Sequence, residues 1–128
     1  MKNKIAAVHD FHEAFGLGIQ NAPTARLDTN RNLLRYKLMR EENEEYLDAA
    51  NNQDLVEVAD ALGDMLYILC GTIIEHGMQH KIEEVFNEIQ KSNMSKLGSD
   101  GKPIYREDGK VLKGPNYFKP DIKSILDK

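Results

Sequence analysis

The chain has only one cysteine and no long apolar run, and these two absences exclude several classes of protein. The single cysteine, Cys70, excludes an internal disulfide framework, and the absence of a Cys/His pair at ligand spacing argues against structural zinc. Because Cys70 ends the apolar run 65–70, we interpret it as a buried, unreactive thiol. No segment approaches the roughly 20 apolar residues of a membrane span or resembles a signal peptide. We therefore expect a cytoplasmic protein that does not enter a membrane.

Several well-known site signatures are missing as well. No Gly-x-x-x-x-Gly-Lys-Ser/Thr occurs, so the Gly-Lys pair at 109–110 is not a P-loop, and 16–18 is no dinucleotide fingerprint. None of the four histidines stands three residues after a glutamate, as di-iron carboxylate bundles require. Nucleic-acid binding is not expected, because the chain has a net charge of −4 and its basic part is short and mixed.

Basic residues are almost absent from one stretch and concentrated in another. Between residues 40 and 64 there are nine acids and one base, a net charge of −8. Between residues 91 and 128 there are nine bases and five acids, a net charge of +4. An acidic middle and a basic tail can collect a cation and an anion at the same place.

The hydrophobic pattern predicts helices along most of the chain, which at 128 residues is expected to be one domain, 1–128. The expected helices cover about 3–16, 30–51, 53 or 54 to 76, and 79–94. Asp108-Gly109 favours a small hairpin, and Pro120 favours a short terminal helix with proline at its first position. The expected fold is all-α, a four-to-five-helix bundle with a short C-terminal hairpin or loop region.

Acidic residues recur at helical spacing on two successive expected helices. One helix face carries three glutamates, and a face of the next helix carries three further acids: Glu41, Glu42, Glu45, Glu57, Asp60 and Asp64. Crowding like charges is unfavourable unless something offsets it. Hard divalent cations prefer oxygen ligands, and the short break at 51–52 makes the two helices antiparallel neighbours. The pattern therefore indicates a site for divalent metal ions.

A solvated acidic face of a purely structural bundle is the alternative explanation. Two details favour a site. The acids at 57, 60 and 64 lie within a mostly apolar segment, 55–74, and that segment contains no Lys or Arg that a solvated face would normally carry. Glu44 points away from the other acids and is interpreted as solvent-facing.

These motifs resemble the all-α NTP pyrophosphohydrolases, a superfamily that includes MazG-like, phosphoribosyl-ATP pyrophosphohydrolase-like and dimeric dUTPase-like proteins. The resemblance extends from about residue 9 to 126, and it rests on an ordered set of segments: His9-Asp10-Phe11-His12, Glu41-Glu42-x-x-Glu45, Ala61-Leu62-Gly63-Asp64-Met65-Leu66-Tyr67, Tyr67-Ile68-Leu69-Cys70-Gly71-Thr72, Ser92-Asn93-Met94-Ser95-Lys96, Asp108-Gly109-Lys110-Val111-Leu112-Lys113 and Pro120-Asp121-Ile122. It implies cleavage of a nucleotide between the α and β phosphates with Mg²⁺, or with Mn²⁺ in its place. It also implies a homodimer or a dimer of dimers, with sites built partly from both subunits.

One position departs from the family pattern. Aligning on Asp64 places Ala61 where the second motif of the family usually has a glutamate. Asp60 or Glu57 could replace it, because both lie within about 60° of Asp64 around the helix axis. The metal ligands expected with most support are Glu41, Glu42, Glu45 and Asp64.

The remaining roles follow from the needs of phosphate hydrolysis. Glu41 or Glu42 could accept the proton of the attacking water. The substrate-binding candidates in the tail are Asn93, Lys96, Lys110 and Lys113. The alternative function is a non-catalytic helical module that binds a nucleotide or a metal, with the alanine at 61 marking a loss of activity.

Overall fold

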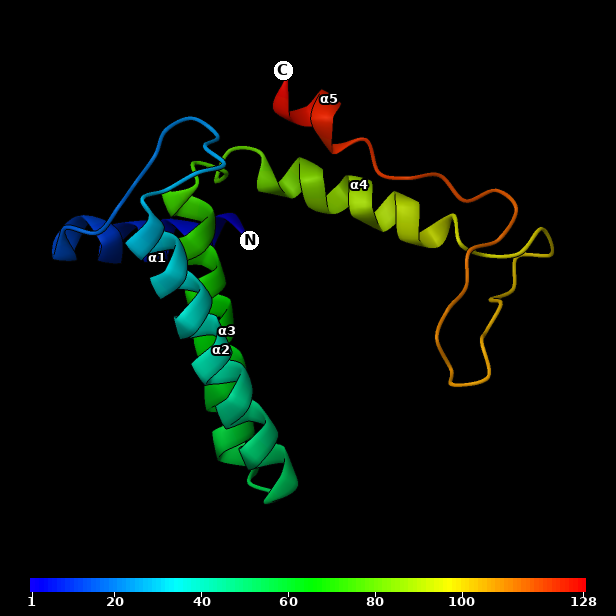
Figure 1. Ribbon diagram of the computed structural model, residues 1–128, viewed down its shortest axis with the longest axis horizontal. Coiled ribbons are helices and arrows are strands. Elements are labelled where there is room, and N and C mark those ends of the chain that lie inside the picture. Colours follow the sequence, from blue (N-terminus) through cyan, green and yellow to red (C-terminus); the bar gives the residue numbers. More distant parts are fainter. The chain divides into compact units, whose positions relative to one another are not determined.

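The computed structural model describes residues 1–128 as five helices without a β-strand, which confirms the all-α prediction (Figure 1). The helices are α1 Lys2–Phe15, α2 Thr29–Asn51, α3 Leu55–Glu75, α4 Ile82–Met94 and α5 Ile122–Leu126. The chain divides into two compact units, Met1–His80 and Lys81–Lys128, and each is described separately below. No helix has the length and apolar character needed to cross a membrane.

Helices α2 and α3 form an antiparallel pair along their whole length (Figure 1). Asp28 caps the start of α2 by accepting hydrogen bonds from the backbone N–H groups of Asn30 and Arg31. Asp54 caps α3 in the same way, and the predicted break between the helices is confirmed. Gln53 lies in this break with a φ of 55°. A connection this short forces the two helices to run side by side.

Helix α1 packs against α3 near the end of the pair where α2 begins and α3 ends (Figure 1). Its buried side chains are Ile5, Val8 and His12. Glycines in the left-handed conformation end both helices as predicted: Gly16 follows α1 with a φ of 67°, and Gly77 follows α3 with a φ of 68°. The connection from α1 to α2 is tied to the end of α3 by backbone hydrogen bonds, which fixes this end of the unit.

The second unit consists of α4, the segment 95–121 and α5. The Ser92 hydroxyl donates to the Phe118 carbonyl over 2.9 Å, and Lys128 pairs with Glu84 at 3.0 Å, so the tail folds back along α4. Two predicted helix starts are wrong by a few residues. Residues 79–81 form a turn before α4, and α5 begins after Asp121, whose carboxylate caps it, rather than at the preceding proline.

The predicted hairpin is present as a short turn closed by an isolated antiparallel bridge between Tyr105 and Val111. Its loop has three residues rather than the two suggested by Asp108-Gly109, because the Arg106 N–H donates to the Lys110 carbonyl over 2.8 Å. Gly109 has a φ of 87°, the left-handed conformation that a three-residue loop places at its last position.

Candidate functional site

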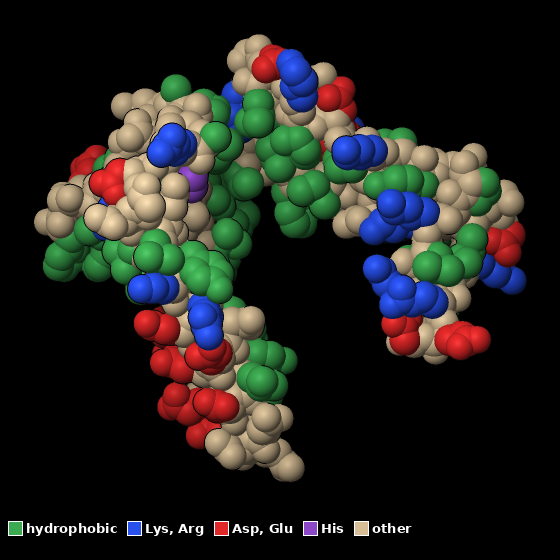
Figure 2. All heavy atoms as spheres, in the orientation of Figure 1, with side chains coloured by type: hydrophobic (Ala, Val, Ile, Leu, Met, Phe, Trp, Pro, Cys, Tyr) green, Lys and Arg blue, Asp and Glu red, His purple; other side chains and the backbone are tan.

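Carboxylates from α2 and α3 converge around Glu42. This side chain is half-buried, and its Oε2 atom is covered yet has no hydrogen-bond partner. Burial raises the pKa of Glu42 to about 7, with further contributions from Glu45, Asp64 and Asp60. The structure thus brings together four of the predicted residues. Figure 2 shows the crowding of acidic side chains along the part of the helix pair remote from α1.

The base nearest to these carboxylates in the sequence does not pair with them. The nearest base in the sequence, Arg40, donates instead to Glu44 over 3.1 Å on the exposed side of α2. A covered carboxylate oxygen without a donor is costly, and a hard divalent cation is the natural partner for several such oxygens. The donor set therefore fits Mg²⁺ or Mn²⁺ in its chemistry.

The carboxylates do not form a closed metal cage in a single chain. No group of three or more His, Cys, Asp or Glu side chains is arranged closely enough to hold an ion alone. Mg²⁺ is usually held by one or two carboxylates together with waters and substrate phosphates. An open, acidic helix pair is compatible with this kind of binding.

The remaining acidic candidates lie at the edge of this cluster. Glu41 is exposed on α2. Glu57 is exposed in the first turn of α3, where it and Glu45 line a shallow hollow of about 240 Å³. Neither Glu41 nor Glu57 contributes to the pKa shift of Glu42, whereas Asp60 does.

Ala61, the departure from the family motif, is almost completely buried, with 2% of its surface exposed. It lies on α3 next to Asp60, and Ala49 is similarly buried on α2. Both positions thus hold small side chains in the interior of the unit. A glutamate in place of Ala61 would place a charged carboxylate in this buried position, which is unfavourable.

The candidates for substrate binding all belong to the second unit. Asn93 is exposed in the last turn of α4, and Lys96 follows it. The Gly114 N–H donates to the Lys96 carbonyl over 2.8 Å, which places Lys113 next to this helix end. Lys113 extends its amine over the ring of Tyr117, 4.7 Å from the centroid. Lys110 lies in the hairpin.

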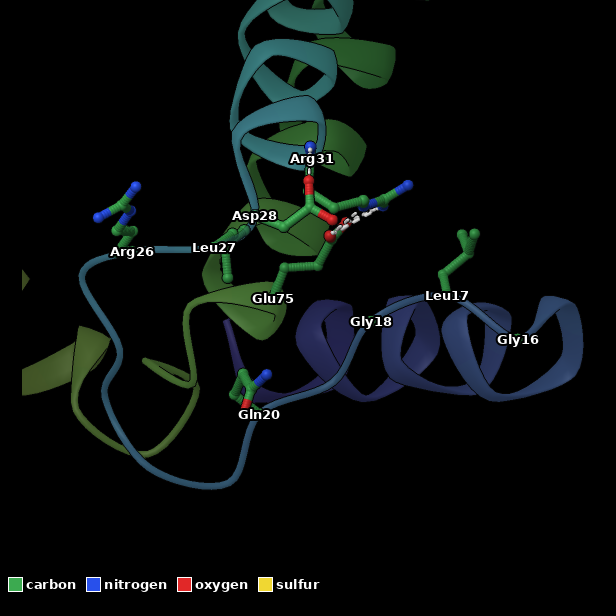
Figure 3. Close-up of a pocket in the computed structure, with 9 residues that line it drawn as sticks. All are labelled: Gly16, Leu17, Gly18, Gln20, Arg26, Leu27, Asp28, Arg31 and Glu75. Atoms are coloured by element: carbon green, nitrogen blue, oxygen red, sulfur yellow. Dashed lines mark hydrogen bonds and ion pairs between the residues drawn. The ribbon is translucent and has the colours of Figure 1, made fainter.

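Sequence reasoning missed a buried ionic network at the opposite end of the α2–α3 pair. Glu75 has 2% of its surface exposed and accepts from Arg31 Nη2 at 2.8 Å and 2.7 Å and from Arg31 Nε at 3.0 Å (Figure 3). Arg35 Nη1 lies 3.0 Å from the same carboxylate. We call these three residues the Arg–Glu–Arg network. The hydrogen bonds to Glu75 raise the pKa of Arg31, and burial lowers that of Arg35.

Arg35 is held by α3 through several contacts. It donates from Nε to the Thr72 hydroxyl over 3.0 Å and from Nη2 to the Ile68 carbonyl over 2.8 Å. Gly71 makes this possible, because a Cβ atom there would lie 2.6 Å from Arg35 Nη2 and 2.8 Å from His12 Nε2. An open pocket of about 380 Å³ borders the network on the side of the α1–α2 connection (Figure 3).

The fold and the site together define an all-helical protein with an acidic antiparallel helix pair. A family model for phosphoribosyl-ATP pyrophosphohydrolase matches residues 8–93, which include the whole helix pair. The chain belongs to this family, and with it to the all-α NTP pyrophosphohydrolases.

Two known proteins show how far the similarity extends. A crystal structure from Exiguobacterium sp. 255-15, described as a "putative NTP pyrophosphohydrolase", aligns with 98% of this chain and 94% of its own, at 26% identity and a TM-score of 0.52. An uncharacterised protein of Acanthamoeba polyphaga mimivirus is 32% identical over 98 residues. That match covers 74% of this chain and 35% of the viral protein, so the chain spans about a third of that relative's length.

Proposed function

We propose that the chain hydrolyses a nucleoside triphosphate or a related nucleotide between its α and β phosphates in the presence of Mg²⁺. The observation that carries the proposal is the gathering of Glu45, Asp60 and Asp64 around Glu42, whose covered oxygen lacks a partner. Membership of the phosphoribosyl-ATP pyrophosphohydrolase family supports the same reaction class.

The proposed ligands are Glu42, Glu45 and Asp64, with Glu41 completing the set on α2. We prefer Asp60 to Glu57 as the further ligand, since Asp60 contributes to the raised pKa of Glu42 and Glu57 does not. When bound, the ion neutralises phosphate charge and favours ionisation of water. Glu42 must lose its proton to act as a ligand, so metal binding and proton release are coupled.

Glu41 or Glu42 takes the proton of the attacking water. The water oxygen forms a new bond to phosphorus, and the bridging P–O bond between the α and β phosphates breaks. Attack at the α phosphorus expels pyrophosphate with the bridging oxygen, and attack at the β phosphorus expels the nucleoside monophosphate with that oxygen. A carboxylate within hydrogen-bond reach of the water is sufficient for this step. The products in either case are a nucleoside monophosphate and pyrophosphate.

The side chains proposed to bind the substrate belong to the second unit. Lys96, Lys110 and Lys113 are proposed to bind phosphate oxygens as point charges, and Asn93 to donate to a sugar or phosphate oxygen. The structural support is a backbone hydrogen bond from Gly114 to the Lys96 carbonyl, which brings the segment that carries Lys113 beside the end of α4. The cation–π contact of Lys113 with Tyr117 leaves its charge available at the surface.

A homodimer or a dimer of dimers is the proposed state of the active protein. Large apolar side chains are exposed on both units, among them Leu55 and Val56 on α3 at 79% and 75% and Phe86 on α4 at 66%. Apolar surface of this extent usually marks a protein interface. Light scattering after size-exclusion chromatography tests this, and a monomer at assay concentration would contradict it.

The activity is tested with a panel of nucleoside triphosphates and Mg²⁺, measuring release of pyrophosphate. Glu42→Gln should abolish release, whereas Glu44→Gln, the same change on the exposed side of α2, should leave it intact. Release that survives Glu42→Gln would refute the site. Metal binding without hydrolysis of any nucleotide would favour the non-catalytic binding module.

A further inference from the structure

One alignment of α2 against α3 accounts for two features: the acidic cluster around Glu42 and the Arg–Glu–Arg network. In an antiparallel helix pair, residues that face one another have numbers with a nearly constant sum. The ion pair of Arg31 with Glu75 gives 106, and the hydrogen bonds of Arg35 to Thr72 and Ile68 give 107 and 103. Glu42 and Asp64 give the sum 106, so the same register places them opposite one another.

The two pairs are also separated by the same number of residues on each helix. Glu42 is 11 residues after Arg31, and Asp64 is 11 residues before Glu75. Eleven residues make about three helical turns and about 16 Å, so the two pairs lie on the same face of the helices. A shift of α3 by one turn would move Asp64 past Glu42 by about 5 Å.

Among the apolar side chains of α2 only Ala49 is fully buried, and Leu38 and Met39 are half-buried. The buried residues of α2 are only Arg35 and Ala49. A small alanine contact can be replaced by another one turn along, whereas the hydrogen bonds of Arg35 to the Thr72 hydroxyl and the Ile68 carbonyl exist at one position only. Gly71 adds a steric requirement, since a shift of one turn would put Tyr67 or Glu75 in its place and bring a Cβ atom against the guanidinium.

We propose that Glu75 is a positioning residue that holds α2 and α3 in register through Arg31 and Arg35, so that Glu42 meets Asp64 at the site. The role builds on the proposed function, because it concerns the same carboxylates. A buried ion pair need not add stability, and in some proteins such groups select one arrangement of helices. The network therefore acts on metal affinity from about three turns away without touching metal or substrate.

The first experiment measures Mn²⁺ affinity by electron paramagnetic resonance in the wild type, Glu75→Gln and Glu44→Gln. The substitution at position 75 retains the size of the side chain and removes its charge, and the substitution at position 44 makes the same change in an exposed ion pair of α2. Loss of a group that only orients a metal ligand weakens metal sites by about 10- to 100-fold, and a register shift that removes Asp64 from the site should weaken binding by at least about tenfold. We expect such a loss for Glu75→Gln only. Wild-type affinity in folded Glu75→Gln would overturn the proposal.

The second experiment measures the register directly and needs neither metal nor activity. Spin labels at Lys37→Cys on α2 and Leu62→Cys on α3 occupy exposed positions, and Cys70 is buried. Labelled chains diluted with unlabelled protein should give one distance in the wild-type background. With Glu75→Gln the distribution should broaden or shift by about 5 Å, one helical turn. An unchanged distribution would overturn the proposal.

A third variant covers the case in which Glu75→Gln does not fold. Replacing the network with apolar residues, as Arg31→Met, Arg35→Met and Glu75→Leu together, should preserve helical content by circular dichroism while weakening Mn²⁺ binding and broadening the distance. Loss of helical content in this variant would contradict a role in register. If the wild type binds no Mn²⁺ and hydrolyses no nucleotide, the proposed function fails, and the spin-label distance still decides the positioning role.

Discussion

Two glycines of α3 should respond in opposite directions to the same substitution. At Gly63 a Cβ atom would meet nothing within 4 Å, so Gly63→Ala should stabilise the protein by about 1 kcal/mol through helix propensity. At Gly71 the methyl group would lie 2.6 Å from Arg35 Nη2 and 2.8 Å from His12 Nε2. Crowding costs about 1–3 kcal/mol, and displacing the guanidinium from its carbonyl costs about 1.5–3 kcal/mol. After the gain in propensity, Gly71→Ala should destabilise by about 2–4 kcal/mol.

The assay is urea unfolding followed by circular dichroism, at one protein concentration because an oligomer makes stability depend on concentration. The two variants should differ by about 3–5 kcal/mol, and their melting temperatures should move in opposite directions. Equal stabilisation by both substitutions would refute the close approach of Arg35 and His12 to the α3 backbone. Equal destabilisation would show instead that the surface around Gly63 is occupied.

Three further results are expected. In metal-free protein the pKa of Glu42 is raised to about 7, so the folded state keeps a proton that the unfolded state loses near pH 4.5. The free energy of unfolding should therefore fall by on the order of 1–2 kcal/mol between pH 4.5 and 7. Urea titrations at several pH values measure this fall, and Glu42→Gln should remove it. Asp28→Ala removes the acceptor for two N–H groups of α2 and should cost about 1 kcal/mol in the same assay, with Asp28→Asn nearly neutral. Gly77→Ala combines a φ of 68° with a Cβ position 2.1 Å from the Ala22 carbonyl oxygen and should cost more than about 2 kcal/mol, whereas Gly101→Ala, at a φ of 75° in open space, should cost only about 1 kcal/mol.

The helices were predictable because their signals are local. The break after Asn51, the glycines at 16 and 77, and the hydrophobic period each act within a few residues, and the structure has helix ends at those points. The late start of α4 was not predictable from periodicity, because Ile82 could continue a pattern that begins earlier; the turn after Gly77 sets the start instead.

The candidate site was predictable in part for the same reason. Glu42 and Glu45 are one turn apart, and the short connection to α3 brings Asp60 and Asp64 opposite them. The role of Glu75 was not visible, since Arg and Glu are normally exposed and the pair is separated by 44 residues. Once Glu42 is aligned with Asp64 in an antiparallel pair, Arg31 falls opposite Glu75. This pairing could have been predicted from the sequence.

The central claim is that carboxylates of α2 and α3 act together on one divalent ion. It is tested most directly by titrating Mn²⁺ into the wild type, Asp64→Asn and Glu44→Gln under identical conditions, with free Mn²⁺ followed by electron paramagnetic resonance. Loss of one ligand should weaken binding by about tenfold or more in Asp64→Asn, and Glu44→Gln should bind as the wild type does. Undiminished Mn²⁺ affinity in Asp64→Asn would contradict the account.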